Sequence, residues 1–419
     1  MTITRRSVLS IPALAVLPAA ALPTAAAAAE TIRIGYIEPL TGNAAAAGQS
    51  IKQGIALALD IINTAHPDLA PLPLAAAAGL PKLGGAKVDV VWADNQGSPA
   101  VGQSDAVRLI TQDHVVALCG AYQSSVTLTA SAAAERYGIP FVTGESVAAN
   151  LTGRGYKYFF RTTPFGPDFA KLYLDFLADV AKTGKATGKI AIVHENTDYG
   201  TSVADSIVQT AAARGIKIAQ RISYSANGTD VSPQVLELKN SSPDVVIFIS
   251  YTSDAILYMK TFHTLGYRPP IVIGDDSGFS DPSFVKAVGD IAQGVLNRSA
   301  FVPGKPDGLS YKVNALFKQR TGRDLDDTTA RSMQGFLVLC DAIDRAGSTK
   351  PDAIRAALAA TDLPADKLII GYKGVKFDAS GQNTLAYSLI IQLQGDDYVP
   401  VWPTGQATAR LTLPFKGWA

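Results

Sequence analysis

Short runs rich in β-branched residues alternate with amphipathic stretches along the chain, and this alternation most constrains the fold. Side chains return to the same face of a strand every two residues and to the same face of a helix about every 3.6 residues, so the two patterns can be told apart. In the stretch 45–63, Ile51, Ile55, Leu59 and Ile62 recur at helical spacing. Strands that alternate with helices predict a parallel sheet covered on both faces. The first series has predicted strands at 32–37, 88–92, 115–119 and 139–143, and predicted helices at 45–63, 99–112 and 124–137.

The alternation restarts in a second series of similar size, which predicts two doubly wound α/β lobes. Helical patterns then fill 309–358, and extended segments follow around 376–393. Because these come after two complete series, we expect the chain to cross back and finish both lobes. The Pro- and Ala-rich stretch 65–85 is interpreted as a surface insertion. We predict lobe 1 as residues 30–162 plus 300–386 and lobe 2 as residues 163–299 plus 387–419.

The composition narrows the class of protein. The chain has 419 residues, of which 47% are hydrophobic and 17% are charged. Typical globular domains contain about 25% charged residues, so this chain is apolar enough to bury a large core and is not disordered. The 37 basic residues balance 36 acidic ones. Because a nucleic-acid-binding protein needs a basic face, we expect no nucleic acid partner.

The first 29 residues have the pattern of an export leader. Arg5 and Arg6 precede an uncharged stretch that ends in small residues at 25–29. Prolines interrupt this stretch and argue against a membrane-spanning helix, so we interpret residues 1–29 as a cleaved signal peptide. The segment 4–10 resembles the twin-arginine export motif, and an ordinary secretory leader with two arginines is the alternative. Since the first cysteine lies far beyond it, we expect an exported, soluble, periplasmic protein without a lipid anchor.

Motifs for enzymatic or metal chemistry are weak in this sequence. The four histidines are scattered singly, and the chain has no G-x-S-x-G elbow, no G-x-x-x-x-G-K-[ST] loop and no G-x-G-x-x-G after its first predicted strand. We therefore expect no metal, no cofactor and no catalytic residue. Cys119 ends a strand-like run and Cys340 lies in a helical pattern. We predict two buried thiols, with a disulfide as the alternative.

The candidate binding residues lie in loops at the carboxyl ends of predicted strands, where open α/β sheets bind ligands. After the strand 115–119, the next helix begins at Ser124 and Ser125. A helix N-terminus with serine hydroxyls binds a carboxylate well, and a simple helix cap is the alternative. The other loops supply Glu145, Ser146, Val147, Tyr199, Asp275 and Asp276. For Tyr199, core packing is the alternative to a ligand contact. For the pair Asp275 and Asp276, the alternative is a solvated turn.

Six short motifs lie at or near the strand ends. They are GYIEPLTG at 35–42, ADNQGSP at 93–99, GAYQSS at 120–125, YGIPF at 137–141, FRT at 160–162 and DYG at 198–200. Together they resemble solute-binding proteins of the branched-chain amino-acid type, the extracytoplasmic components of ABC importers. The resemblance spans residues 31 to about 390. It implies the type I periplasmic binding protein fold, in which two doubly wound lobes are joined by a hinge of three crossings.

The resemblance also implies roles for individual residues. Ser124 matches the serine that binds the ligand carboxylate through its hydroxyl and backbone. Ser125 lies where the family usually has another small residue. Tyr199 matches the tyrosine that lines the second lobe. Asp276 matches the acid that pairs with the ligand ammonium, with Asp275 as the alternative one residue away.

Two parts of the site depart from the family pattern. The family's Ala-Ala-Thr segment aligns with Glu145, Ser146 and Val147, so Val147 removes a hydroxyl and Glu145 places a carboxyl group beside the pocket. Tyr122 lies where the family often has a smaller apolar residue, and its ring would narrow the pocket or stack on a flat ligand. An amino acid, an amide, a short peptide and an aromatic acid therefore remain open alternatives for the ligand.

The function that the resemblance implies is solute binding without catalysis. The ligand would dock on lobe 1, and hinge closure would bring lobe 2 over it and exclude water. The closed form would then deliver the ligand to the membrane permease of an ABC importer. A ligand-sensing receptor or regulator on the same fold is the alternative, and an α/β enzyme is a more distant one.

Overall fold

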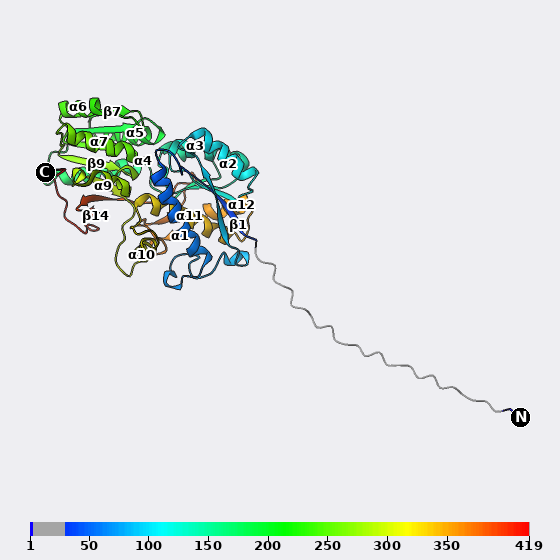
Figure 1. Ribbon diagram of the computed structural model, residues 1–419. Helices are drawn as coiled ribbons and strands as arrows, with labels where there is room; N and C mark the ends of the chain where they lie inside the picture. Colours follow the sequence, from blue (N-terminus) through cyan, green and yellow to red (C-terminus); the bar gives the residue numbers. More distant parts are fainter. Residues whose placement is uncertain (3–29, 419) are drawn as a thin grey trace.

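The computed structural model describes residues 1–2 and 30–418. Apart from its first two residues, the predicted signal peptide of residues 1–29 lies outside the described residues. The described chain forms two α/β lobes that lie side by side (Figure 1). Lobe 1 is the half that contains the first strand of the chain, and lobe 2 is the other half. The lobe boundaries given above stay a prediction.

Lobe 1 carries the first series of strands and helices. Its elements are β1 (Ile32–Glu38), α1 (Ala45–Asn63), β2 (Val88–Asp94), α2 (Pro99–Thr111), β3 (Ala117–Gly120), α3 (Ser124–Tyr137), β4 (Phe141–Thr143), β5 (Phe159–Arg161), α10 (Leu309–Thr321), α11 (Asp327–Ala346) and α12 (Pro351–Ala359). In this described part the sheet has the order β2-β1-β3-β4-β5 and is parallel. The α1 and α11 helices pack on one face, and α2 and α3 on the other. The strand order reverses beside β1, which is where such sheets bind ligands.

Lobe 2 repeats this arrangement. Its elements are α4 (Gly166–Ala181), β6 (Ile190–Glu195), α5 (Asp198–Ala213), β7 (Ile218–Tyr224), α6 (Ser232–Ser241), β8 (Val245–Ile249), α7 (Thr252–Thr264), β9 (Ile271–Asp275), α8 (Ser277–Ser280), α9 (Pro282–Val288), β10 (Leu296–Ser299), β13 (Leu389–Gln394) and β14 (Asp397–Trp402). Over the described residues the sheet order is β14-β13-β10-β9-β8-β6-β7. The order β7-β6-β8-β9-β10 is parallel and matches that of lobe 1. The predicted pair of similar lobes is confirmed.

One edge of the lobe 2 sheet differs from the purely parallel prediction. The β13 strand pairs antiparallel with both β10 and β14. A parallel strand needs a long crossover before it, usually a helix. Here β13 follows an extended linking segment, and β14 follows β13 through a tight turn, so both add to the edge in antiparallel orientation.

The chain crosses between the lobes three times within residues 30–418, as the resemblance implied. The first crossing, 162–165, joins β5 to α4, and the second, 300–308, joins β10 to α10. The third, 377–388, joins the small hairpin of β11 (Asp362–Pro364) and β12 (Gly374–Lys376) to β13. Linkers that cross between two lobes form a hinge about which the lobes can rotate.

The stretch 65–85 is more than the surface insertion predicted from its composition. It contains the short 3-10 helices Pro67–Leu69 and Pro81–Leu83. Leu69, Leu72 and Leu80 within it are buried in the same core as α1. Proline and alanine dominated the sequence pattern, whereas these few leucines determine where the segment packs.

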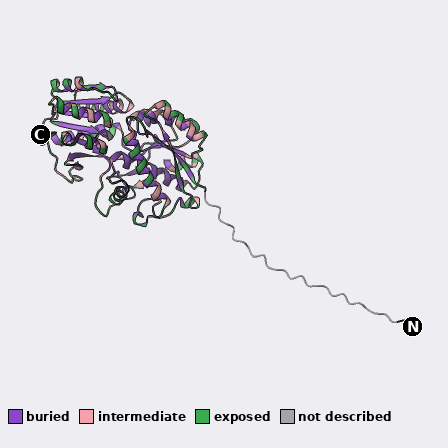
Figure 2. Ribbon diagram, viewed as in Figure 1, coloured by how far each residue is buried: buried purple, intermediate pink, exposed green. Residues whose placement is uncertain are grey.

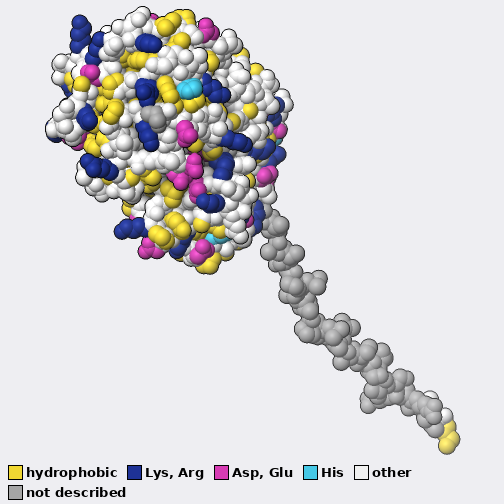
Figure 3. Space-filling view, turned by 60° about the vertical axis from the view of Figure 1, so that its left-hand side comes forward, with side chains coloured by type: hydrophobic (Ala, Val, Ile, Leu, Met, Phe, Trp, Pro, Cys, Tyr) yellow, Lys and Arg dark blue, Asp and Glu magenta, His cyan; other side chains and the backbone are white. Residues whose placement is uncertain are grey.

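The buried residues follow the strands and the inner helix faces (Figure 2). Ile51, Ile55 and Ile62 of α1 are buried and Leu59 is half-buried, as their spacing predicted. On the face shown in Figure 3, basic and acidic side chains are interspersed. No helix among the described residues combines the length and apolar character needed to cross a membrane.

The two cysteines are free and buried, which confirms the prediction of two buried thiols. Cys119 lies in β3 and Cys340 in α11, on the α1 side of the lobe 1 sheet. Burial raises the pKa of both thiols, so they stay protonated at neutral pH.

Candidate functional site

A small cavity lies where the two lobes meet. The space in it that is open to a water molecule measures about 10 Å³, so its walls lie almost in contact, whereas pockets that hold drug-sized ligands measure roughly 300–1,000 Å³. Its lining comes from the carboxyl ends of strands and the starts of helices in both lobes. Lobe 1 contributes Tyr122, Ser124, Glu145 and Val147, and lobe 2 contributes Tyr199, Tyr251 and Asp276.

The turn between β3 and α3 builds one wall in lobe 1. Gly120 has φ +121°, and a Cβ there would lie 2.1 Å from the carbonyl oxygen of Ile37, so only glycine fits. Tyr122 follows with a left-handed φ of 62°. This turn directs Tyr122 into the cavity and places Ser124 at the first position of α3.

Ser124 links the turn to the neighbouring loop rather than capping its own helix. The N-cap of α3 is Gln123, with no side-chain cap bond. The Ser124 hydroxyl oxygen instead accepts the backbone N–H groups of Val147 (3.3 Å) and Ala148 (3.2 Å). Both bonds use the oxygen as an acceptor, so the hydroxyl proton can still be donated to a ligand oxygen.

Glu145 and Ser146 occupy the next loop in different ways. One Glu145 oxygen accepts the hydroxyl of Thr143 (3.2 Å) and the N–H of Gly144 (3.1 Å), and the other accepts the Tyr36 hydroxyl (3.3 Å). Burial raises the pKa of Glu145, with Arg331 acting in the opposite direction. The Ser146 hydroxyl donates to the carbonyl of Tyr122 (3.0 Å), so it supports the wall from behind.

Tyrosine rings from both lobes face one another across the cavity. The Tyr251 ring lies 5.9 Å from Tyr122 and 5.3 Å from Tyr199, measured between ring centroids. The Tyr199 hydroxyl donates to the backbone oxygen (2.7 Å) and the carboxylate (2.8 Å) of Asp275. The sequence analysis missed Tyr251, although this residue lies between the end of β8 and the start of α7, the kind of position that identified the other loops.

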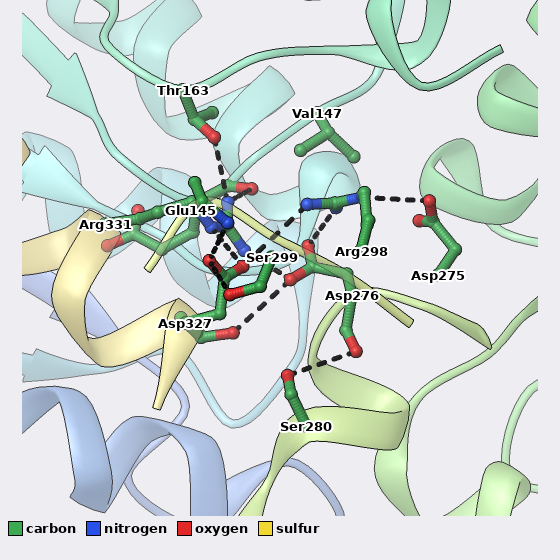
Figure 4. A network of polar contacts seen from close by, with 12 residues as sticks. Glu145, Val147, Thr163, Asp275, Asp276, Ser280, Arg298, Ser299, Asp327 and Arg331 are labelled. Carbon is green, nitrogen blue, oxygen red and sulfur yellow. Dashed lines mark hydrogen bonds and ion pairs between the residues drawn. The ribbon is translucent and has the colours of Figure 1, made fainter. Parts of the chain in front are cut away.

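A buried network of aspartates and arginines lies behind the cavity (Figure 4). Asp275 is fully buried and accepts bonds from Arg298 Nε (3.0 Å), the Tyr173 hydroxyl and Tyr199. Asp276 pairs through Oδ2 with Arg298 Nη2 (2.7 Å) and through Oδ1 with Arg331 Nη2. Burial alone would raise the pKa of Asp276, but the two guanidinium charges outweigh burial and lower it below its usual value.

Arg331 joins the two lobes through this network. It lies in α11 of lobe 1, where its Nε pairs with Asp327 one turn earlier (2.9 Å). Its Nη1 donates to the carbonyl oxygens of Gly144 (3.2 Å) and Glu145 (3.1 Å) and to the Thr163 hydroxyl (3.0 Å). Its Nη2 reaches Asp276 of lobe 2.

The nine predicted site residues divide into two groups. Of the described residues, those that line the cavity include Tyr122, Ser124, Glu145, Val147, Tyr199 and Asp276. Ser125, Ser146 and Asp275 lie behind it. Ser125 is half-buried on α3, Ser146 supports Tyr122, and Asp275 holds Tyr199 and Arg298.

Sequence comparison places the chain among known proteins. Residues 31–395 match the periplasmic binding protein family. The chain belongs to this family. A Leu/Ile/Val-binding protein homolog 8 of Brucella abortus (strain 2308) is 32% identical over 402 residues, covering 92% of this chain and 94% of the relative. The resemblance stated from the sequence motifs is thereby confirmed, and the relative bears the name of a binding protein.

Solved structures of periplasmic binding proteins share this fold. The branched-chain amino acid transporter substrate-binding protein LivJ of Streptococcus pneumoniae, in complex with isoleucine, is 20% identical with a TM-score of 0.74 and covers 92% of this chain and 100% of its own. A solute-binding protein of an ABC transporter from Rhodopseudomonas palustris BisB5, in complex with 3,4-dihydroxybenzoic acid, is 20% identical with a TM-score of 0.72. The match covers 87% of this chain and 93% of that protein. At this identity the likeness extends to the fold alone.

Proposed function

We propose that this protein is the solute-binding component of an ABC importer. It binds a small amino acid, or a related carboxylate or amide, in the cleft between its lobes and delivers it to a membrane permease. One observation carries the proposal: strand ends of both lobes line the same small cavity, and a hinge of three crossings joins these lobes. A ligand that contacts both walls stabilises the closed form by its differential affinity.

Binding begins on lobe 1 in this proposal. The first backbone N–H groups of α3 and the hydroxyl proton of Ser124 offer donors to a ligand carboxylate, and the helix dipole adds to the attraction. Closure then brings Tyr199, Tyr251 and Asp276 over the ligand and excludes water. The protein breaks no bond, so it acts as a carrier and not as an enzyme.

The partner and the compartment rest on the family and the leader. Relatives and structural neighbours are named as binding proteins, some of them of ABC transporters. The closed form therefore presents both lobes to a permease. Export through the predicted signal peptide of residues 1–29 places the protein in the periplasm.

A thermal-shift screen tests the proposal. Protein stripped of co-purified ligand by partial unfolding and dialysis is screened against free amino acids, simple amides and aromatic carboxylates. A ligand at about 100 times its Kd adds about 2.7 kcal/mol to the free energy of unfolding, which raises Tm by several degrees. We expect a rise in Tm with at least one of these compound classes. If no class raises Tm, the proposal is contradicted.

Ser124 provides the matched variant for this screen. Ser124→Ala removes the hydroxyl that we assign to the ligand carboxylate and should weaken binding by at least about tenfold, since a hydrogen bond to a charged group contributes about 1.5–3 kcal/mol. Ser104→Ala, at an exposed serine of α2, is the control and should bind like the wild type. Equal affinity in Ser124→Ala would remove Ser124 from the site.

A further inference from the structure

The acidic groups of the cavity decide whether a positively charged ligand group can bind there. Of the described residues that line the cavity, Glu145 and Asp276 carry carboxyl groups. Both oxygens of Glu145 already accept bonds from lobe 1. Both oxygens of Asp276 already face arginines. A ligand ammonium would therefore have to displace a donor that the protein itself supplies.

The two arginines hold Asp276 from opposite sides. Arg298 comes from β10 of lobe 2, and Arg331 comes from α11 of lobe 1. Both side chains are fully buried, and Arg298 also stacks on the ring of Phe169, 3.5 Å from its centroid. Figure 4 shows Asp276 between the two guanidinium groups. Removing either arginine would leave a buried carboxylate with one fewer positive partner, which is costly.

The remaining acids of the network also have partners. Asp275 is bonded to Arg298 and to the hydroxyls of Tyr173 and Tyr199. Asp327 pairs with Arg331 and accepts the N–H groups of Ala300 (2.6 Å) and Phe301 (3.2 Å). The three aspartates exceed the two arginines by one formal negative charge, which hydroxyl and backbone donors stabilise through hydrogen bonds.

An ammonium group at Asp276 would be a third cation beside two buried ones. Like charges repel strongly where water is excluded, and the added group would lack a free acceptor in compensation. A carboxylate or amide oxygen has the opposite need, because it requires donors, and α3 and Ser124 present them. The charge pattern of the cleft therefore suits a ligand carboxylate or amide and not a ligand ammonium group.

We propose that Arg331 occupies the position of a ligand ammonium group, so that this cleft selects small carboxylates or amides that carry no ammonium group. This inference rests on the proposed function and narrows its ligand class. The rings of Tyr122, Tyr199 and Tyr251 would enclose the apolar or flat body of such a ligand.

Ligand pairs that differ only in the amino group test this inference. We would titrate the stripped wild-type protein by calorimetry with L-leucine against isocaproate and with L-phenylalanine against hydrocinnamate. The acid without the amino group should bind at least about tenfold more tightly than its amino acid, the factor expected for one displaced charge-assisted bond. Equal or tighter binding of the amino acids overturns the inference but leaves the proposed function standing. If neither member of either pair binds, the comparison is repeated with a compound that raises Tm in the thermal-shift screen and its amino-substituted counterpart, and silence across that screen contradicts the proposed function and, with it, this inference.

Variants of Arg331 test the role of the residue itself. Arg331→Gln frees Asp276 of one cation, so the affinity ratio should shift by about tenfold towards the amino acid member. Arg331→Lys keeps the positive charge and should keep the wild-type preference. A merely structural role would weaken both ligands alike and leave the ratio unchanged, which would overturn the assignment.

Arg345 supplies the matched control on the same helix. It pairs with Asp341 one turn earlier (2.8 Å), as Arg331 does with Asp327, but it lies away from the cavity and is partly exposed. Arg345→Gln should therefore retain the wild-type affinity ratio. Circular dichroism checks the folding of each variant, and if Arg331→Gln does not fold, the ligand pairs on the wild type and on Arg331→Lys still decide the question.

Discussion

Asp254, at the start of α7 in lobe 2, links the stability of the protein to pH. Its carboxylate is buried and accepts the N–H of Asn227 (3.0 Å) and the Tyr224 hydroxyl (3.4 Å). Burial, with a smaller contribution from the charge of Glu195, raises the pKa of Asp254 to about 6. The folded state therefore keeps this proton at pH values where the unfolded chain, with an ordinary pKa of about 3.9, has lost it.

The sign of the effect follows from this difference. The folded state binds more protons between about pH 4 and 6, so the contribution of Asp254 to stability is present below pH 4 and falls as the pH rises to 6. Asp254→Asn removes this contribution. We expect its stability relative to the wild type to rise by about 2 kcal/mol from pH 4 to 7, measured by urea unfolding. A difference that does not change with pH would show that Asp254 has an ordinary pKa.

Cavity residues could be predicted from the sequence where they follow the carboxyl end of a strand. Tyr122, Ser124, Glu145, Val147, Tyr199 and Asp276 all follow strand carboxyl ends, and all line the cavity. The partners of Asp276 could not be predicted in this way. Arg331 lies 55 residues further along the chain, inside a helix, and a helical pattern does not say which turn faces a loop of the other lobe.

At the scale of elements, a close contact of two glycines positions α11. A Cβ on Gly144 would lie 2.4 Å from the backbone oxygen of Arg331, and a Cβ on Gly335 would lie 3.3 Å from the backbone of Gly144. The loop after β4 therefore lies directly against α11, which lets Arg331 reach Asp276. Backbone atoms cannot yield as a flexible side chain would.

Gly144→Ala should consequently separate α11 from this loop. We expect a loss of about 2 kcal/mol in the free energy of unfolding, as for other overpacked sites, together with weaker ligand binding because Arg331 shifts. Gly188→Ala is the control, since a Cβ at Gly188 meets nothing within 4 Å. Thermal unfolding and calorimetry measure both effects, and a Gly144→Ala variant as stable as the control would show that the contact can relax.

The bounds of long helices were predictable from the sequence, whereas some of the short strands were not predicted. The predicted bounds of α1 and α3 agree with the structure, because several helical turns repeat the same apolar pattern. The strands β5 and β10, of three and four residues, are too short to show a repeat. The leucines of 65–85 are buried in the core that also contains residues of α1 and α11, and no local pattern encodes that packing.

At the scale of the whole molecule, the two lobes share one strand order and are joined by three crossings. Repetition of the alternating pattern predicted the two lobes, and the late segments predicted the return of the chain. Besides the pair of Arg331 with Asp276, the N–H of Ala149 donates to the Ser202 hydroxyl across the lobes (2.8 Å). We expect these polar contacts to break when the hinge opens.

Small-angle X-ray scattering tests most directly whether ligand binding closes the lobes. The stripped protein is measured alone and with a saturating amount of the compound that gives the largest thermal shift. Hinge closure predicts that the ligand lowers the radius of gyration and that the closed structure described above then fits the scattering curve. An unchanged curve at saturation, with binding verified by calorimetry on the same sample, would contradict enclosure of the ligand between the lobes.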